Sequence, residues 1–176
     1  MALVNTAPGQ VHVRPFHPRD AAPLTTLLHE AYGQLAAMGL NFTAVDQDEA
    51  TTVSRARAGH CLVAEIEGRI VGTGTFSMPP YAPLIAQWAP AAEPGTVWLN
   101  QLAVDPSRQG LGVARSIFDV ALAWSRVHGA KVIGLDTAEP ATHLVELYRR
   151  WGFEARGTIQ WEGKTYRSVV MTRELQ

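Results

Sequence analysis

The segment Gln109-Gly-Leu-Gly-Val-Ala-Arg115 says more about the architecture than any other part of the chain, because it follows an apolar run and opens a stretch with helical spacing. The first N–H groups of a helix lack partners inside it, and with the helix dipole they attract anions such as phosphate. Gly110 and Gly112 let a ligand approach the backbone, since they carry no side chain. Arg108 and Arg115 add positive charge. These residues predict a phosphate-binding turn, while a turn that only tightens a strand-to-helix connection stays open as the alternative.

The turn does not match either common nucleotide-binding motif. A P-loop requires Gly-Lys-Ser/Thr, which the sequence lacks. A dinucleotide-binding fingerprint requires a third glycine where Arg115 stands, and it follows its strand directly, whereas five residues separate Val104 from Gly110. The pattern therefore argues against both a P-loop and a dinucleotide site.

Outside the turn, apolar periodicity and Gly/Pro breaks predict an alternation of strands and helices. Strands are expected at residues 11–14, 60–66, 69–76, 96–104, 131–136, 153–161 and 164–171, the last two as a hairpin around Glu162-Gly163. Helices are expected at 18–38, 46–58, from Gly112 to about 128, and at 140–151, with a long Pro- and Ala-rich loop at 78–95. Only the β-α-β unit from 96 to 136 requires a parallel crossover. This order predicts an α/β (α+β) fold, a mixed sheet covered by helices on both faces.

Composition limits the function classes. The 176 residues are 18% charged, against about 25% in a typical domain, and carry a formal net charge of −1. These values exclude a charged disordered chain and argue against a nucleic-acid binder, which usually shows a basic patch. A single cysteine, Cys61, excludes an intramolecular disulfide and a multi-cysteine metal site, and the histidines show no metal-ligand spacing. We expect one domain over residues 1–176, with 1–9 flexible.

The sequence also predicts a cytoplasmic protein without a membrane span. Residues 1–10 lack the basic and apolar regions of a signal peptide. The uncharged stretch 70–92 is long enough to cross a bilayer, but its glycines and prolines exclude one continuous membrane helix.

Two segments together resemble the GNAT superfamily of N-acetyltransferases. Leu102-Ala-Val104 and the following turn resemble its acetyl-CoA motif Q/R-x-x-G-x-G/A, here Gln109, Gly112 and Ala114. Leu147-Tyr-Arg-Arg-Trp-Gly-Phe153 is similar to the family's Tyr-x-x-x-Gly-Phe segment. The order of the expected elements is also the family's order over nearly the whole chain. The resemblance implies a mostly antiparallel central sheet of about seven strands flanked by about four helices.

The resemblance also implies acetyl-CoA as co-substrate, without a metal, and assigns it a site. The backbone of Leu102, Ala103 and Val104 would pair with the pantetheine arm. Backbone amides would hold the pyrophosphate at Gln109, Gly110, Leu111, Gly112, Val113, Ala114 and Arg115. Tyr148 matches the family tyrosine that donates a proton to the departing CoA thiolate; its plainer interpretation is a core aromatic, at i, i+4 from Leu144 on one helix face.

For the reaction, the resemblance implies direct attack of a primary amine on acetyl-CoA in a ternary complex. The alternative is a non-catalytic acyl-CoA-binding sensor or interaction module on the same fold. In many relatives, a glutamate on the strand corresponding to 96–104 acts as the general base. Here that strand holds no acid, only Asn100 and Gln101, whose amides are not bases but could orient a water. Other candidates for the base are Asp136, Glu139 and His143, of which the two acids fit equally well as caps of the following helix.

The acceptor amine stays open, and a homodimer is compatible with the sequence. Segments 32–48 and 78–95 correspond to the region that sets acceptor specificity in the family. Charges are scarce nearby, because residues 70–104 contain only one, Glu93. This scarcity predicts an apolar wall beside the acceptor and favours a hydrophobic amine over a polycation.

Overall fold

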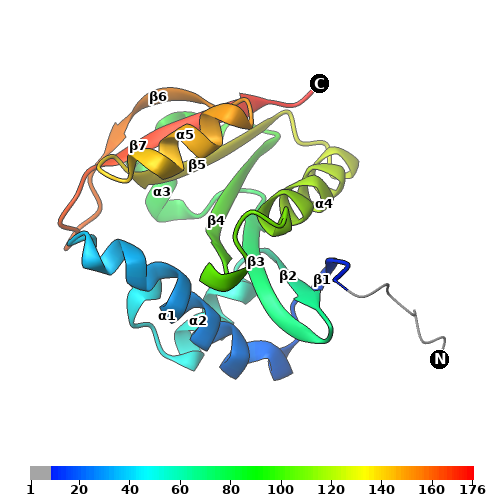
Figure 1. Ribbon diagram of the computed structural model, residues 1–176. Coiled ribbons are helices and arrows are strands. Elements are labelled where there is room, and N and C mark those ends of the chain that lie inside the picture. The colour runs from blue at the N-terminus through cyan, green and yellow to red at the C-terminus, as the bar shows by residue number, and fades with distance from the viewer. Residues whose placement is uncertain (1–8) are drawn as a thin grey trace.

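The computed structural model describes residues 9–176 and shows one sheet of seven strands in the order β1-β2-β3-β4-β5-β7-β6 (Figure 1). The strands are β1 (His12–Pro15), β2 (His60–Ile66), β3 (Arg69–Ser77), β4 (Thr96–Val104), β5 (Val132–Ala138), β6 (Glu154–Ile159) and β7 (Ser168–Glu174). Every neighbouring pair is antiparallel except β4 and β5. The predicted mixed, mostly antiparallel sheet with one parallel crossover is confirmed. Apart from Gly9, the segment expected to be flexible lies outside the described residues.

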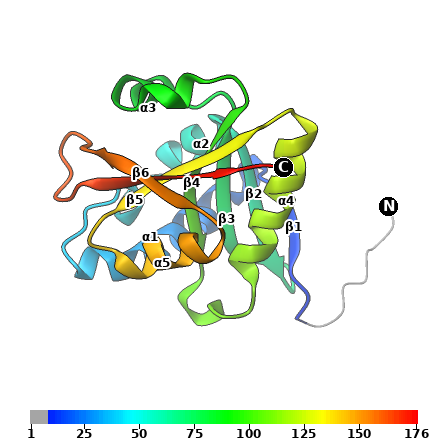
Figure 2. The same ribbon diagram turned by 90° about the horizontal axis from the view of Figure 1, so that it is seen from above.

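Helices cover both faces of the sheet, as predicted. They are α1 (Ala21–Ala37), α2 (Glu49–Arg57), α3 (Ala82–Gln87), α4 (Val113–Val127) and α5 (Thr142–Arg150). On one face, α4 buries Ile117 and Phe118 in the largest core cluster. On the other, Leu28 of α1 and Ala56 of α2 pack with Val63 of β2. Figure 2 shows the β3–β4 region between α4 and α1. None of the helices within residues 9–176 has both the length and the apolar character that a membrane crossing requires.

β4 and β5 separate halfway along β4, and this separation shapes the site. Their parallel pairing begins at Thr96 and Val132 and ends at Leu99 and Leu135. β3 continues to pair with β4 as far as Val104. The second half of β4 is therefore hydrogen-bonded on one edge, and its other edge, toward β5, has no strand partner.

A β-bulge in β4 lies beside this separation. Asn100 pairs with Thr75 and Ala103 with Thr73, so two residues of β4, Gln101 and its neighbour, oppose a single residue of β3. Gln101 has a φ of 50°, in the left-handed region that residues other than glycine rarely adopt. Such strain costs on the order of 1–3 kcal/mol and is found preferentially at functional sites. Because a bulge bends its strand, it directs this half of β4 away from β5.

The prediction of a loop at 78–95 is wrong in part, because this segment contains α3 and a 3-10 turn at Ala89–Ala92. Apolar side chains explain the extra structure: Leu84 and Trp98 are fully buried in one cluster with residues of β6 and β7. Proline stands in the first turn of both short helices, where its missing N–H costs no hydrogen bond. The described residues thus contain five helices instead of about four.

The final hairpin has shorter strands than predicted, since β6 ends at Ile159 and β7 begins at Ser168. The residues between them form a turn, in which the Lys164 N–H donates to the Trp161 carbonyl oxygen at 3.3 Å, and they also bond to other elements. Lys164 Nζ donates to the carbonyl oxygen of Asn41 at 2.7 Å, and the Thr165 N–H donates to Asn41 Oδ1 at 2.9 Å. These contacts hold the connection between β6 and β7 against the chain that follows α1.

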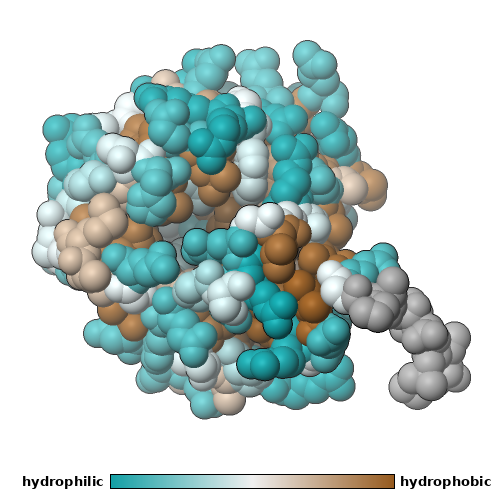
Figure 3. Space-filling view, in the orientation of Figure 1, coloured by the Kyte–Doolittle hydropathy of each residue, from teal (hydrophilic) through white to brown (hydrophobic). Residues whose placement is uncertain are grey.

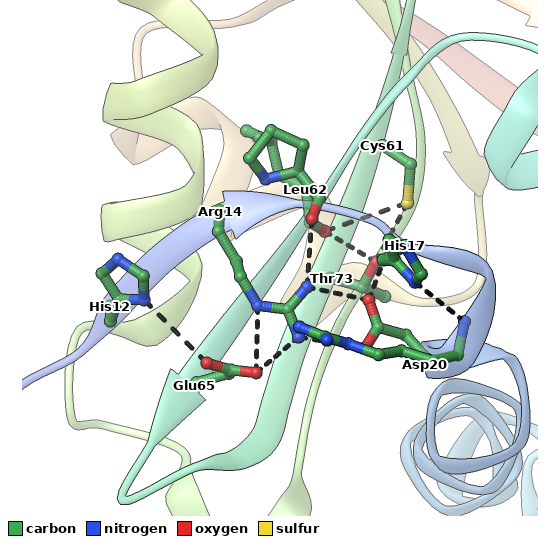
Figure 4. Close-up of polar contacts among 10 residues, drawn as sticks. His12, Arg14, His17, Asp20, Cys61, Leu62, Glu65 and Thr73 are labelled. Carbon is green, nitrogen blue, oxygen red and sulfur yellow. Dashed lines mark hydrogen bonds and ion pairs between the residues drawn. The ribbon is translucent and has the colours of Figure 1, made fainter. Parts of the chain in front are cut away.

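A partly buried ion pair ties β1 to the beginning of α1 (Figure 4). Arg14 donates from its two terminal nitrogens to the carboxylate of Asp20, at 2.8 and 2.9 Å, and its Nε donates to Glu65 of β2 at 3.0 Å. Asp20 is only 4% exposed. The Arg14 guanidinium holds the pKa of Asp20 below its usual value. The pair therefore fixes α1 against the edge of the sheet.

Candidate functional site

A cleft of about 440 Å³ opens where β4 and β5 separate. It is lined by residues of both strands, of α1, α2 and α5, and of the connection between β6 and β7. Figure 3 shows this side of the molecule hollowed near its centre between hydrophilic residues. The aromatic, amide and charged side chains of the lining are Tyr32, Gln34, Phe42, Arg55, Tyr81, Asn100, Gln101, Gln109, Asp136, His143, Tyr148, Trp161, Glu162, Lys164 and Tyr166.

Four of the predicted cofactor-binding residues line this cleft: Leu102, Ala103, Val104 and Gln109. The first three lie on the half of β4 that has no partner toward β5, so their backbone is open to pairing with an extended ligand. Tyr32 of α1 donates its hydroxyl to the carbonyl oxygen of Leu102 at 3.3 Å. Burial raises the pKa of Tyr32 to about 12, so it remains a donor at neutral pH. The open edge is thus held in place from α1.

The other six predicted cofactor-binding residues follow Gln109 in the chain and do not line the cleft. They are Gly110, Leu111, Gly112, Val113, Ala114 and Arg115. Gly110 and Gly112 have φ values of 79° and 77°, and a Cβ on either would meet nothing within 4 Å. Gly112 precedes α4, whose first N–H groups receive no side-chain cap. The Val113 side chain is buried in the core, and Arg115 pairs with Asp119 at 2.9 Å. Only the backbone of this turn is therefore available in the way the motif requires.

Tyr148 combines both interpretations that the sequence allowed. It is 7% exposed, and its ring packs edge-on against Trp151 and Phe153. Its hydroxyl makes no hydrogen bond within residues 9–176. Every fully buried polar side-chain atom of these residues has a hydrogen-bond partner, so the Tyr148 oxygen is not fully buried and reaches the cleft that the residue lines. Burial raises the pKa of Tyr148 well above its usual value. The phenol is therefore protonated at neutral pH and able to donate into the cleft.

Asp136 of β5 lies where the two strands separate, and two indoles hold its carboxylate. Trp98 Nε1 donates to Oδ1 at 3.0 Å, and Trp161 Nε1 donates to Oδ2 at 2.7 Å. Burial raises the pKa of Asp136 above its usual value. The alternative role as a helix cap is wrong for this residue and for Glu139, because the N-cap of α5 is Ala141 and no side chain bonds there.

Three further charged side chains in the cleft, Arg55, Glu162 and Lys164, come from elements that carry no motif. Arg55 of α2 is half-buried, and one of its N–H groups donates to Gln47 Oε1 at 3.3 Å. Burial lowers the pKa of Arg55. Lys164 reaches the cleft from the connection between β6 and β7. The sequence signal for Arg55 is faint: it stands beside Ala56 on the buried side of a short, polar helix.

The wall expected to be apolar is uncharged but includes the polar side chains of Tyr81, Asn100 and Gln101. The cleft residues that belong to segment 70–104 are Tyr81 and the run from Leu99 to Val104, none of which is charged. The remaining lining nevertheless contributes the charged residues Arg55, Asp136, Glu162 and Lys164. The cleft as a whole therefore combines an uncharged β4 wall with charged side chains from other elements.

Gly134→Ala should destabilise the protein and displace the support of Asp136. A Cβ on Gly134 would lie 2.1 Å from the nearest ring atom of Trp98, which is fully buried. Because the ring is rigid and enclosed, we expect the free energy of unfolding, measured by urea denaturation, to fall by about 1–3 kcal/mol. The matched control is Gly33→Ala on an exposed position of α1, where a Cβ meets nothing within 4 Å. That change should instead add roughly 0.5–1 kcal/mol of helix stability, and equal effects at the two positions would contradict the packing argument.

Known proteins share both the sequence pattern and the length of this chain. The model of the acetyltransferase (GNAT) family matches residues 24–153. The S-(2-succino)cysteine N-acetyltransferase of Bacillus subtilis is 30% identical over 161 residues, which cover 90% of this chain and 92% of that protein. The spermine/spermidine N(1)-acetyltransferase of the same species is 26% identical over 110 residues, 62% of this chain and 66% of the other.

Solved structures show the same fold at low sequence identity. The ribosomal-protein-S18-alanine N-acetyltransferase of Escherichia coli superimposes with a TM-score of 0.71 at 13% identity, covering 95% of both chains. The yncA protein of Salmonella typhimurium, whose structure contains its cofactor acetyl-CoA, gives a TM-score of 0.71 at 16% identity, again over 95% of both chains. Because the family model matches most of this chain, the chain belongs to the acetyltransferase (GNAT) family, which is also the family that its two sequence motifs resemble.

Proposed function

We propose that this protein transfers the acetyl group of acetyl-CoA directly to a primary amine that is bound with it in the cleft. The observation that carries the proposal is the separation of β4 from β5, which leaves the backbone of Leu102–Val104 open in the same cleft as the Tyr148 hydroxyl. An extended thioester arm would pair with that edge, and its reacting end would face the tyrosine.

Different parts of the chain supply different steps of the transfer. The Leu102–Val104 backbone binds the pantetheine arm as an added strand would, and N–H groups near Leu102 polarise the thioester carbonyl. The turn at 109–115 holds the pyrophosphate at the N-terminus of α4. Tyr148 protonates the departing thiolate. A free thiol has a pKa of about 8.5, below that of a phenol, so this proton transfer depends on close placement of the hydroxyl.

Relatives support an amine acceptor but differ in its chemistry. One is named for S-(2-succino)cysteine, an amino-acid derivative, and another for the polyamines spermine and spermidine. The uncharged wall at 70–104 favours a hydrophobic amine, whereas Arg55, Asp136 and Lys164 add charge to the same cleft. The wall alone therefore does not determine the acceptor.

Acetyl-CoA should stabilise the folded protein. At a concentration one hundred times its dissociation constant, a ligand that binds only the folded state adds about 2.7 kcal/mol to the free energy of unfolding. A thermal or urea melt with and without acetyl-CoA measures this difference. Absence of any stabilisation would contradict both acetyl transfer and the alternative function as an acyl-CoA sensor.

Release of free thiol separates these two functions. Acetyl-CoA mixed with the protein and a panel of primary amines should yield free CoA, detected with a thiol reagent, only in the presence of a suitable amine. The control is the same mixture without amine, which measures hydrolysis. Stabilisation by acetyl-CoA without thiol release for any amine would favour the sensor.

A further inference from the structure

Two side chains of opposite charge line the cleft without forming an ion pair with each other. Arg55 of α2 and Asp136 of β5 both face it, and each acts on the other's titration through space. Within residues 9–176, neither side chain forms an ion pair. Burial of an unpaired charge is costly, and a ligand with complementary charges removes that cost. The arrangement therefore points to an acceptor that carries both a negative and a positive group.

Arg55 suits a carboxylate. A guanidinium has five N–H donors in a planar fork that matches the two oxygens of a carboxylate. The only side-chain or backbone acceptor of Arg55 within the described residues is Gln47 Oε1, at 3.3 Å, which leaves most of the fork unused. Lys164 adds positive charge on the same side, and its Nζ donates to Asn41 and to Thr43 Oγ1, at 2.7 and 3.1 Å.

Asp136 suits an ammonium group. Each of its oxygens accepts one indole N–H, from Trp98 or Trp161, and each carboxylate oxygen has a second lone pair. The indoles fix the carboxylate at the separation of β4 and β5, next to the open edge to which the thioester arm is assigned. An amine held there would lie beside the carbonyl that it attacks.

We propose that the acceptor is an α-amino acid, or a derivative with free amino and carboxylate groups, whose carboxylate binds Arg55 and whose ammonium group binds Asp136. This assignment rests on the proposed acetyl transfer. Asp136 accepts one proton from the ammonium group, and the freed nitrogen lone pair forms the C–N bond while the C–S bond breaks. The sulfur receives the Tyr148 proton, and the second proton that nitrogen loses restores the tyrosine. Asp136 thus takes the role of the base that β4 lacks.

The same arrangement disfavours a polyamine. Spermidine carries only positive charges, so it leaves Arg55 and Lys164 without an anionic partner, while only Asp136 and Glu162 of the lining attract its ammonium groups. An amino acid whose carboxylate has been converted to an amide keeps the ammonium group but loses the partner for Arg55. Spermidine and the carboxamide therefore separate the role of Arg55 from that of Asp136.

The test compares matched acceptors on matched variants. L-Phenylalanine, L-methionine, L-glutamate and S-carboxymethyl-L-cysteine are each assayed for thiol release beside their α-carboxamides, with spermidine as the polycation. The variants are Arg55→Met, Arg57→Met and Asp136→Asn. Arg57 lies on the same helix as Arg55 but is exposed and outside the cleft lining, so its variant controls for the loss of a positive charge on α2.

We expect kcat/KM for the best amino acid to exceed that for its carboxamide at least about tenfold, in line with the weight of a charge-assisted bidentate contact. Arg55→Met should remove this preference by slowing the amino acid only, and Arg57→Met should keep it. Asp136→Asn should slow amino acid and carboxamide alike, because both must lose an ammonium proton. Equal use of carboxamide, a preference for spermidine, or equal losses for both substrates in Arg55→Met would overturn the assignment.

A binding measurement keeps this test independent of turnover. With CoA present, the amino acid should raise the melting temperature more than its carboxamide does, and Arg55→Met should abolish the difference. If no acceptor releases thiol while this binding pattern holds, the proposed transfer fails and the amino-acid site stands. If thiol is released but the amino acid and the carboxamide bind equally, the amino-acid site fails and the transfer stands.

Discussion

Tyr148→Phe should lower kcat by about 10²–10⁴-fold, the range that positioned proton donors usually contribute. The phenylalanine ring keeps the packing of Tyr148 against Trp151 and Phe153, so the change removes only the hydroxyl that reaches the cleft. Without it, the CoA thiolate must leave unprotonated or take its proton from water. Steady-state assays of thiol release at saturating acetyl-CoA and amine measure kcat directly.

Two measurements separate loss of the proton donor from loss of structure. The dissociation constant for acetyl-CoA should stay near that of the unmodified protein, because the backbone of β4 and the glycine turn are untouched. Tyr166→Phe is the matched control: Tyr166 is also 7% exposed and lines the same cleft, yet no step of the proposed transfer uses its hydroxyl. A Tyr148→Phe protein with unchanged kcat, or one no slower than Tyr166→Phe, would remove Tyr148 from the mechanism.

The glycine turn and Tyr148, which the proposed function uses, could be predicted from the sequence because their determinants are local. Gly110 and Gly112 adopt the positive φ values for which glycine is suited, and α4 begins directly after them. Tyr148 lies on one helix, and its place follows from the motif around it. The Gln101 bulge beside the separation of β4 and β5 has no signal in the residue types.

The charged side chains of the cleft could be predicted only in part, because they come from distant parts of the chain. Asp136 is a candidate base from the sequence, whereas Arg55 and Lys164 carry no such signal. Arg55, Asp136 and Lys164 come from a helix, a strand and a connection, and none of them belongs to a motif. The fate of Trp161 shows the physical reason. The sequence predicts a strand through position 161, but β6 ends at Ile159, and the indole of Trp161 bonds to Asp136 at 2.7 Å. Local propensity does not contain such contacts.

Arg14→Met should lower the free energy of unfolding at neutral pH by more than the ~1 kcal/mol of an exposed pair and by no more than the ~3–5 kcal/mol of a fully buried one, because Asp20 is buried while Arg14 is partly exposed. Arg14 supplies both N–H groups that bind Asp20 and also contacts Glu65. After the change, Asp20 keeps its bond from the His17 N–H, at 2.7 Å, but no cation within the described residues bonds to it. Urea denaturation monitored by tryptophan fluorescence measures the loss.

Arg19→Met is the matched control, because Arg19 is exposed and acts on Asp20 only through space. Its loss should fall within the range of surface charges, roughly 0–1 kcal/mol. An effect as large as that of Arg14→Met would show that net charge, and not the partly buried pair, sets the stability.

The pH dependence of the Arg14→Met effect follows from the pKa of Asp20. Because Arg14 holds that pKa below its unfolded value, the pair stabilises the fold fully above the unfolded pKa, and the contribution is lost as pH falls through the native pKa. The difference in unfolding free energy between the unmodified protein and Arg14→Met should thus be constant from neutral pH down to about 5 and shrink below about 4, where unfolded aspartate becomes protonated.

None of Arg14, Asp20 and Glu65 lines the cleft. The folded Arg14→Met protein should therefore keep its kcat, and a parallel loss of kcat would mean that the pair positions α1, and with it Tyr32, for the reaction.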